Sequence, residues 1–284
     1  PPASSIKPAI AMYGIEEGLI DWDFSIFDEG FFTLPEDGRI YRDWKEGGHG
    51  DTNLFKAITQ SSNTYFFDLA YRSDINQLNK HLSSLGFGGK ACIDCFEEDK
   101  VFVPEPSWKM NKHNFGWFKG DTVNMGVGQG YLVSTPIQLA KYAYIMANKG
   151  KFSDLSLKKD LVKSEKSIEF NKFSNDDWFK LHESMVNVIE GNTGTARRLR
   201  EKKNYIVAAK TGTAELVSGD NREQYSETRL DNSLRDHALI IAFGPMPNPK
   251  YAVSVVIENG ESGGSVAGPV AVNVLNQLIN NEKT

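Results

Sequence analysis

The chain has 284 residues, 40% hydrophobic and 24% charged, which is enough to bury one large core or two smaller ones. A formal net charge of -5 gives no positive field to attract phosphate backbones or anionic lipids, so nucleic acid is not expected as a partner. The longest uninterrupted apolar run, Ala238 to Phe243, is far shorter than the roughly 20 residues of a membrane-spanning helix.

The first third of the chain has the pattern of buried helices. Residues Lys7 to Ile15 carry small and apolar side chains, which predicts a buried helix entered at Ser4 or Ser5. Between Asn53 and Tyr71, two apolar stretches flank the polar residues 61–64. This pattern predicts a helix, a polar turn and a second helix.

Further helices are predicted along the chain. One covers Ile75 to Leu85, and Thr135-Pro136 opens another that runs through Asn148. The polar stretch from Lys149 to Asn175 is expected to be surface structure that ends in a helix cap, followed by a helix with one apolar face. A closing amphipathic helix begins near Pro269.

The last third contains three short apolar runs typical of strands: Tyr205 to Ala209, Ala238 to Phe243 and Ala252 to Ile257. We expect them to be neighbouring antiparallel strands, covered by the closing helix in an α+β fold. Because a stable sheet usually has more than three strands, we expect upstream residues to complete it.

Ser4-Ser5-Ile6-Lys7 is an S-x-x-K motif at the start of the first predicted helix. Positions i and i+3 share a helix face, so the Ser4 hydroxyl could meet a neutral Lys7 amine that takes its proton during nucleophilic attack. The motif should also occur about once by chance in a chain of this size. A second copy, Ser156 to Lys159, is interpreted as solvated surface.

Ser61-Ser62-Asn63 is an S-x-N motif in the polar turn between two predicted helices. Its hydroxyl could relay protons and its amide could hold a peptide group of a substrate. Capping of the following helix is the alternative role.

Lys210-Thr211-Gly212-Thr213 ends a predicted strand. A strand lining a cleft could bind a substrate carboxylate through Lys210 and a hydroxyl, while Gly212 allows a close approach of the substrate backbone.

Motifs of the types S-x-x-K, S-x-N and K-T-G, in this order, resemble the motif set of penicillin-binding proteins and class A β-lactamases. Their setting strengthens the resemblance, since the first opens a helix, the second lies between helices and the third lies on a strand. Further segments resemble class B penicillin-binding proteins of the elongation type. These are Tyr41 to Trp44, Gly48 to Gly50, Asn63 to Phe67, Gly120 to Thr122, Gly126 to Gly130, Thr135 to Gln138, Lys210 to Ala214, Leu234 to His237 and Glu258 to Gly260.

The resemblance implies an antiparallel sheet covered by helices plus a helical subdomain, and one transpeptidase domain over residues 1–284 that lacks its N-terminal strands, membrane anchor and pedestal domain. It implies Ser4 as the nucleophile and Lys7 as its base. It also implies that Ser61 relays a proton and that Asn63 binds the donor peptide. Lys210, Thr211 and Thr213, with Gly212 beside them, are implied to bind the terminal carboxylate. The N–H groups of Ser4 and Thr213 are implied to form the oxyanion hole.

The implied activity is cross-linking of peptidoglycan stem peptides during cell elongation, without a cofactor, at the periplasmic face of the bacterial inner membrane. Implied partners are stem peptides, β-lactam antibiotics and, through upstream regions, a lipid II polymerase and elongation-complex proteins. A serine β-lactamase or a β-lactam-sensing receptor domain are the alternatives, and a scaffold without activity is a third. A β-lactamase needs a deacylating carboxylate, and none stands out in the sequence.

Two groups of possible metal ligands remain. Some elongation-type relatives use the positions of Asp28, Asp43 and His49, with a cysteine in the middle of S-x-N, as a zinc site. Here the middle residue is Ser62, so we expect a hydrogen-bonded Asp43–His49 cluster and no metal.

Cys92 and Cys95 form a C-x-x-C without a second ligand pair, which favours a structural role and, in an oxidising compartment, a local disulfide. Among the other histidines, His237 could be a satisfied core residue or a donor at the cleft rim.

Overall fold

A three-stranded antiparallel sheet, in the strand order Ala208–Ala214, His237–Gly244 and Tyr251–Ile257, lies in the C-terminal part of the chain, as predicted. The computed structural model describes residues 1–99, 101–159, 164–216 and 234–281. Its sheet strands are β7 (Ala208–Ala214), β8 (His237–Gly244) and β9 (Tyr251–Ile257). Within the described residues β9 pairs only with β8, so completion of the sheet by upstream strands stays a prediction.

The first strand was predicted too early, at Tyr205 to Ala209. Ladder pairing starts at Ala208, opposite Phe243, and runs through the whole Lys-Thr-Gly-Thr segment. Beyond Phe243 the partner strand reaches Gly244 and Pro245, and a proline has no N–H to extend the ladder. The bounds of β7 are therefore set by its pairing with β8, although its own residues have a weak propensity for strands.

Alternate residues of the sheet enter two hydrophobic clusters. Leu239, Ile241 and Phe243 of β8 pack with the helical part of the molecule, whereas Ile240 and Ala242 pack with the C-terminal helix. Among the described residues, three α-helices contact the sheet: α7 (Pro136–Ala147), α8 (Asn175–Glu190) and α10 (Gly268–Asn281). They match the predicted helices, with caps at Thr135 and, for α8, at Ser174.

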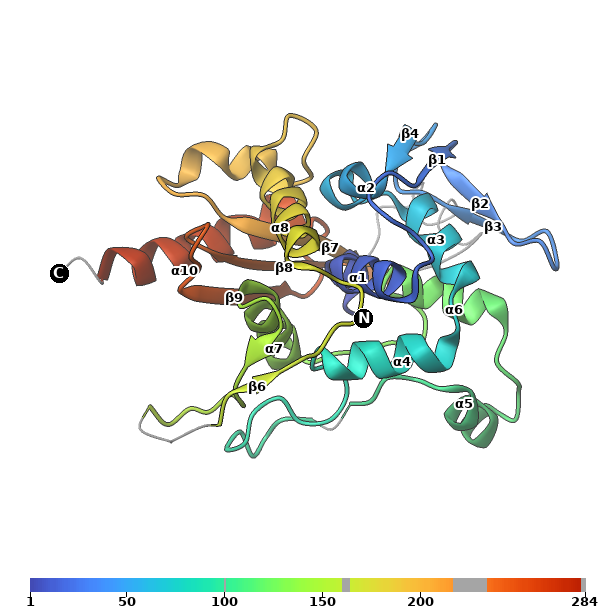
Figure 1. The fold of residues 1–284 in the computed structure, drawn as a ribbon, viewed down its shortest axis with the longest axis horizontal. Coiled ribbons are helices and arrows are strands. Elements are labelled where there is room, and N and C mark those ends of the chain that lie inside the picture. Colours follow the sequence, from blue (N-terminus) through green and yellow to red (C-terminus); the bar gives the residue numbers. More distant parts are fainter. Residues whose placement is uncertain (100, 160–163, 217–233, 282–284) are drawn as a thin grey trace.

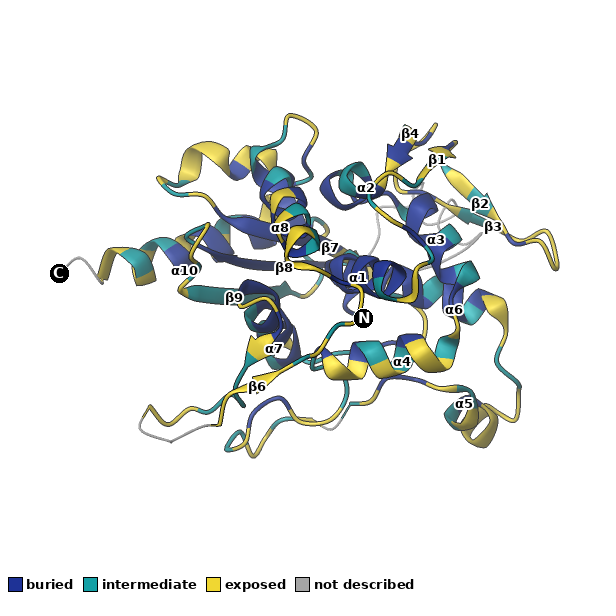
Figure 2. Cartoon of the chain, in the orientation of Figure 1, coloured by how far each residue is buried: buried dark blue, intermediate teal, exposed yellow. Residues whose placement is uncertain are grey.

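The central helix α1 (Lys7–Glu17) lies between the sheet side and the helical side of the molecule (Figure 1). It is buried over most of its length, and Figure 2 shows it dark blue. This agrees with the predicted buried helix, since its apolar residues occur on all sides. A 3-10 turn, Ala3–Ile6, leads into it.

The helical side contains the predicted helix–turn–helix and the helix after it, and two shorter helices that were not predicted. The bounds are α2 (Leu54–Gln60), α3 (Asn63–Arg72), α4 (Ile75–Ser84), α5 (Pro106–His113) and α6 (Lys119–Gly126).

Three small antiparallel strand pairs were not predicted either, because strands of two to four residues show no readable alternation. They are β1 (Ser25–Asp28) with β4 (Gly50–Asn53), β2 (Phe31–Thr33) with β3 (Ile40–Arg42), and β5 (Lys151–Phe152) with β6 (Lys166–Ser167). No helix in the described ranges is both long and apolar enough to cross a bilayer.

Candidate active site

The turn that carries Ser4 is held by one hydrogen bond to another segment and by one within the turn itself. The Ala3 N–H donates to the Gly128 carbonyl at 2.9 Å, and the Ser5 hydroxyl donates to the Pro2 carbonyl at 2.5 Å. Gly128 has a left-handed φ of 71°, and a Cβ there would lie 2.2 Å from the Ala3 carbonyl oxygen. Glycine is therefore required at this contact, and Ser4 itself remains partly exposed.

Lys7 is fully buried at the start of α1, and its amine is directed at the S-x-N motif. Its Nζ donates to the Ser61 carbonyl and to Asn63 Oδ1, both at 2.7 Å, and lies 3.3 Å from Ser61 Oγ. Burial lowers the pKa of Lys7 to about 7, although the charges of Asp43 and Asp28 act in the opposite direction. A substantial fraction of this amine is thus neutral near pH 7.

The S-x-N motif is the junction between α2 and α3. Ser61 ends α2 in a left-handed conformation with a φ of 61°, and the Ser62 hydroxyl caps α3 by accepting from the Tyr65 N–H. Capping was the alternative role considered for this motif, and Ser62 performs it. The same geometry leaves Ser61 and Asn63 to face the buried lysines.

Lys210 reaches the same hydroxyl from strand β7. Its Nζ donates to Ser61 Oγ at 2.7 Å and to the Thr211 carbonyl at 3.1 Å. The side chain is fully buried, and its pKa lies well below the usual value because of burial and then the charge of Lys7. Residues from α1, the α2–α3 junction and β7 thereby meet at Ser61.

Among the described residues, the Ser4 hydroxyl does not hydrogen-bond to the Lys7 amine as the motif spacing suggested, although the Lys7 backbone N–H donates to the Ser4 carbonyl. Within the described part of the chain, Ser4 Oγ makes no hydrogen bond, while the Lys7 amine is engaged by Ser61 and Asn63. The reason is that the carbonyl and amide oxygens of the second motif offer the buried amine stronger acceptors. The role of Lys7 as the base of Ser4 stays a prediction.

The rest of the third motif lies beside the Ser4 turn. Gly212 packs so closely that a Cβ there would lie 3.2 Å from the Pro2 carbonyl oxygen and 3.3 Å from the Ser5 nitrogen. Thr211 is buried and Thr213 is exposed. The close packing brings the N–H groups of the predicted oxyanion hole onto neighbouring segments.

Two site residues were missed by the sequence reasoning. Thr195 Oγ1 lies 2.6 Å from Thr211 Oγ1, so it orients one of the predicted carboxylate-binding hydroxyls. The Trp44 indole donates to the Ser61 carbonyl at 3.0 Å while 58% of the residue stays exposed. Trp44 belonged to a segment noted only for its family resemblance, and nothing in the local sequence marks Thr195.

The expected Asp43–His49 cluster is present. His49 Nε2 lies 3.3 Å from Asp43 Oδ1, and its Nδ1 lies 3.0 Å from Gln60 Oε1. Burial alone would raise the pKa of Asp43, but the hydrogen bond with His49 and the charge of Lys7 lower it to about 2. Asp28 is close by, and its Oδ2 accepts from the Ser62 hydroxyl at 2.7 Å.

These residues do not fit a zinc site. A structural zinc is normally held by four thiolate, imidazole or carboxylate ligands, and here the fourth position offers the neutral Ser62 hydroxyl. The carboxylate oxygens of Asp28 and Asp43 already accept hydrogen bonds from protein groups. The donor set is thus satisfied without a cation.

The remaining sequence features lie outside this site. Cys92 and Cys95 form a disulfide, which agrees with the structural interpretation of the C-x-x-C. Ser156 bonds to Asp94 and Lys159 is exposed, so the second S-x-x-K is surface. His237 is partly buried, and its Nδ1 accepts from the N–H of Asn259.

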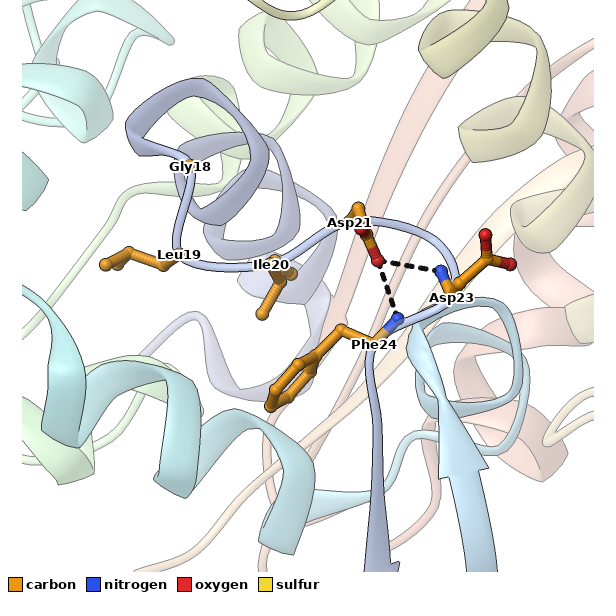
Figure 3. A pocket seen from close by; sticks show the side chains of 6 residues that line it. All are labelled: Gly18, Leu19, Ile20, Asp21, Asp23 and Phe24. Carbon is orange, nitrogen blue, oxygen red and sulfur yellow. Dashed lines mark hydrogen bonds between the residues drawn. The ribbon is translucent and has the colours of Figure 1, made fainter.

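A surface depression lies at the far end of α1 (Figure 3). Gly18, at its edge, is 11 residues from Lys7, or about 16 Å along a helix. The Asp21 carboxylate there accepts from the N–H groups of Asp23 and Phe24, at 3.0 and 2.7 Å. The Asp21 carboxylate is therefore hydrogen-bonded within its own turn, and we assign the depression no role in the chemistry.

Comparison with known proteins gives one consistent family. The model of the penicillin-binding protein transpeptidase domain matches residues 1–276. Peptidoglycan D,D-transpeptidase MrdA of Haemophilus influenzae is 38% identical over 99% of this chain and 44% of its own length. The protein of the same name from Acinetobacter baumannii is 39% identical over 94% of this chain and 40% of its own. The chain therefore spans less than half the length of these relatives.

Solved structures agree in fold. The PBP2 of Pseudomonas aeruginosa, in complex with WCK 5153, has a TM-score of 0.86 and 35% identity, covering 98% of this chain and 60% of that one. The PBP2 of Helicobacter pylori, in complex with MreC, has a TM-score of 0.86 and 31% identity, covering 98% of this chain and 50% of that one. The predicted α+β fold and family resemblance are confirmed.

Proposed function

This chain belongs to the penicillin-binding protein transpeptidase family, and we propose that it is the catalytic domain of an elongation-type peptidoglycan D,D-transpeptidase. The observation that carries the proposal is the meeting of the Lys7 and Lys210 amines at the Ser61 hydroxyl, with Asn63 bonded to Lys7. Three segments far apart in sequence supply these groups. The burial of the two lysines and their lowered pKa values suit acyl transfer.

In the first half-reaction, Ser4 Oγ attacks the carbonyl between the two terminal D-alanines of a stem peptide. Lys7 in its neutral form takes the Ser4 proton, and the N–H groups of Ser4 and Thr213 stabilise the oxyanion. Collapse of the tetrahedral intermediate breaks the peptide bond and leaves an acyl-enzyme on Ser4. The leaving amine departs as D-alanine once it has gained a proton.

Ser61 is suited to deliver that proton. A hydroxyl has one donor and two acceptor positions, and Ser61 Oγ already lies within hydrogen-bonding distance of the amines of Lys7 and Lys210. With both acceptor positions facing lysine amines, its own proton remains for donation to the leaving group. Transfer to the leaving amine is followed by replacement of the proton from a neighbouring lysine.

Substrate is held by the second and third motifs. Asn63 holds the donor peptide, and Lys210, Thr211 and Thr213 bind its terminal carboxylate, with Gly212 allowing a close approach. In the second half-reaction, an amine on a neighbouring stem peptide attacks the acyl-enzyme, the ester bond to Ser4 breaks, and the proton lost by the amine restores the Ser4 hydroxyl as the cross-link forms. β-Lactams acylate Ser4 by the same route and remain attached.

We propose that this reaction takes place at the periplasmic face of the bacterial inner membrane, in company with a lipid II polymerase and elongation-complex proteins. Support comes from the Helicobacter pylori PBP2 structure, which is a complex with MreC, and from the similarity to a peptidoglycan synthase complex with a TM-score of 0.78.

A transfer assay tests the activity. The protein is incubated with a stem peptide ending in D-Ala-D-Ala and an amine acceptor peptide, beside a Ser4→Ala variant. Release of D-alanine together with a cross-linked product, both lost in the variant, supports the proposal. Rapid hydrolysis of an added β-lactam, without any cross-linked peptide, favours the serine β-lactamase alternative. Acylation by a β-lactam without any peptide turnover favours the sensing receptor.

A further inference from the structure

The Asp43 carboxylate caps the helix that carries Asn63. Its Oδ2 accepts from the backbone N–H groups of Asn63 at 2.5 Å and Thr64 at 2.9 Å, and lies 3.3 Å from Thr64 Oγ1. The first N–H groups of a helix have no partner within it, and a negative charge is favourable there. Asp43 supplies both from a different segment, the loop after β3.

Asp43 is itself held in place from the other side. Its Oδ1 accepts from the Lys45 N–H at 3.1 Å and lies 3.3 Å from His49 Nε2. The loop between these residues passes so close to β1 that a Cβ on Gly48 would lie 2.1 Å from the Asp28 carbonyl oxygen. Only glycine fits there, so the loop that carries Asp43 is held close to β1.

A second hydrogen bond joins the S-x-N motif to β1. The fully buried Ser62 hydroxyl donates to Asp28 Oδ2 at 2.7 Å, while Asp28 Oδ1 accepts from the Gly30 N–H at 2.8 Å. Ser62 also caps α3 through the Tyr65 N–H. The three N–H groups of the first turn of α3 are thus all bonded, two by Asp43 and one by Ser62.

The contacts continue from Asp43 to the predicted base. Asn63, fixed through its N–H, accepts from Lys7 Nζ through its side chain. The charges that raise the pKa of Lys7 are those of the Asp43 and Asp28 carboxylates, and Lys7 in turn lowers the pKa of Lys210. A displacement of Asp43 therefore alters both the position of Asn63 and the electrostatic potential at the Lys7 amine.

We propose that Asp43, with Ser62 and Asp28, forms a metal-independent anchor that positions Asn63 and Lys7 for acylation. Here "anchor" means these three residues and their hydrogen bonds. The proposal rests on the proposed function, and makes Asp43 a positioning residue. Ser62 supplies a hydroxyl where a thiolate would complete a zinc ligand set, so hydrogen bonds perform the positioning.

The first test separates the anchor from a metal site. Wild-type protein is dialysed against a chelator, its zinc content is measured by mass spectrometry, and acylation by a fluorescent penicillin is timed before and after. We expect substoichiometric zinc and an unchanged rate. Stoichiometric zinc with a rate that falls on chelation overturns the proposal. A wild type that is never labelled counts instead against the proposed function.

The second test removes the carboxylate. In Asp43→Asn, the charge is removed and an NH₂ group replaces one of two oxygens, of which one accepts from the N–H groups of α3 and the other from the Lys45 N–H. We expect acylation to slow by about ten- to a hundredfold, as for the loss of a buried hydrogen bond to a charged group. Asp51→Asn is the matched control, because Asp51 lies on the adjacent strand β4 with an exposed side chain. Equal rates for the two variants overturn the proposal.

A pH profile distinguishes positioning from a general loss of stability. Without the Asp43 charge, the acid limb of acylation should move to lower pH, because the protonated form of Lys7 loses a stabilising neighbour. If Asp43→Asn does not fold, Thr64→Val removes only one donor to Asp43 and should give a smaller loss of rate. An unshifted limb in folded Asp43→Asn, or an unchanged rate in Thr64→Val, contradicts the anchor.

A third variant tests why no metal is needed. Ser62→Cys restores a soft ligand beside Asp28, Asp43 and His49, whose ligand atoms lie within 4.8 Å of one another. We expect this variant to bind zinc at about one ion per chain and to melt at a higher temperature with zinc than without it. A variant that takes up no zinc refutes the assignment of metal independence to Ser62.

Discussion

Replacing Lys7 with methionine tests the assignment of the base. The variant keeps much of the side-chain volume in this buried place but removes the amine that bonds to Ser61 and Asn63. With the pKa lowered from 10.5 to about 7, about half of the amine is neutral at pH 7, compared with about one part in three thousand for an ordinary lysine. General-base catalysis contributes about 10²- to 10⁴-fold, which is the expected loss in Lys7→Met.

The assay is the rate of acylation by a fluorescent penicillin, measured between pH 5 and 9. Since only the neutral amine accepts a proton, the wild-type rate should rise about tenfold per pH unit up to about pH 7 and then level off. Lys159→Ala, in the exposed second S-x-x-K, is the matched control and should keep the wild-type profile. A folded Lys7→Met that is acylated at the normal rate refutes the role of Lys7 as the base.

Three further changes test the surroundings of the site. Gly128→Ala should slow acylation by about tenfold or more, because its Cβ would lie 2.2 Å from a carbonyl oxygen of the Ser4 turn; a normal rate would show that the turn is not fixed by this contact. Thr195→Val should weaken reversible binding of a carboxylate-bearing β-lactam by about tenfold, because Thr211 loses its hydrogen-bond partner. The affinity is measured by titration in a Ser4→Ala background, which cannot be acylated, with Thr193→Val as the control. An unchanged affinity in Thr195→Val would contradict this role. Cys92 and Cys95 should react with iodoacetamide only after reduction, without a change in acylation rate; labelling before reduction contradicts the disulfide.

Much of this site was predictable because the motif residues carry local signals. The S-x-x-K sits where apolar residues begin a helix, and the S-x-N interrupts two apolar stretches, so the helix starts follow from neighbouring residues. The relative order of the three motifs then suggested a single cleft. The structure brings Lys7, Ser61, Asn63 and Lys210 together, as that argument required.

The contacts that orient these groups were not predictable locally. Thr195 meets Thr211 only because the segment after α8 packs beside β7, and Asp43 reaches Asn63 only through the fold of the loop after β3. The Lys7 amine was expected at Ser4, but bonds to the second motif instead. Spacing along a helix gives the face of a side chain, whereas its partner depends on the groups that tertiary packing brings near.

The central claim is tested most directly by covalent labelling of Ser4. Wild-type and Ser4→Ala proteins are incubated with a fluorescent penicillin, and the adduct is followed by intact mass over hours and located by peptide mapping. The account predicts one stable adduct per chain, on Ser4, and none in the variant. An adduct elsewhere, equal labelling of Ser4→Ala, or no labelling of a folded wild type would contradict it, and rapid loss of the adduct would point to a β-lactamase.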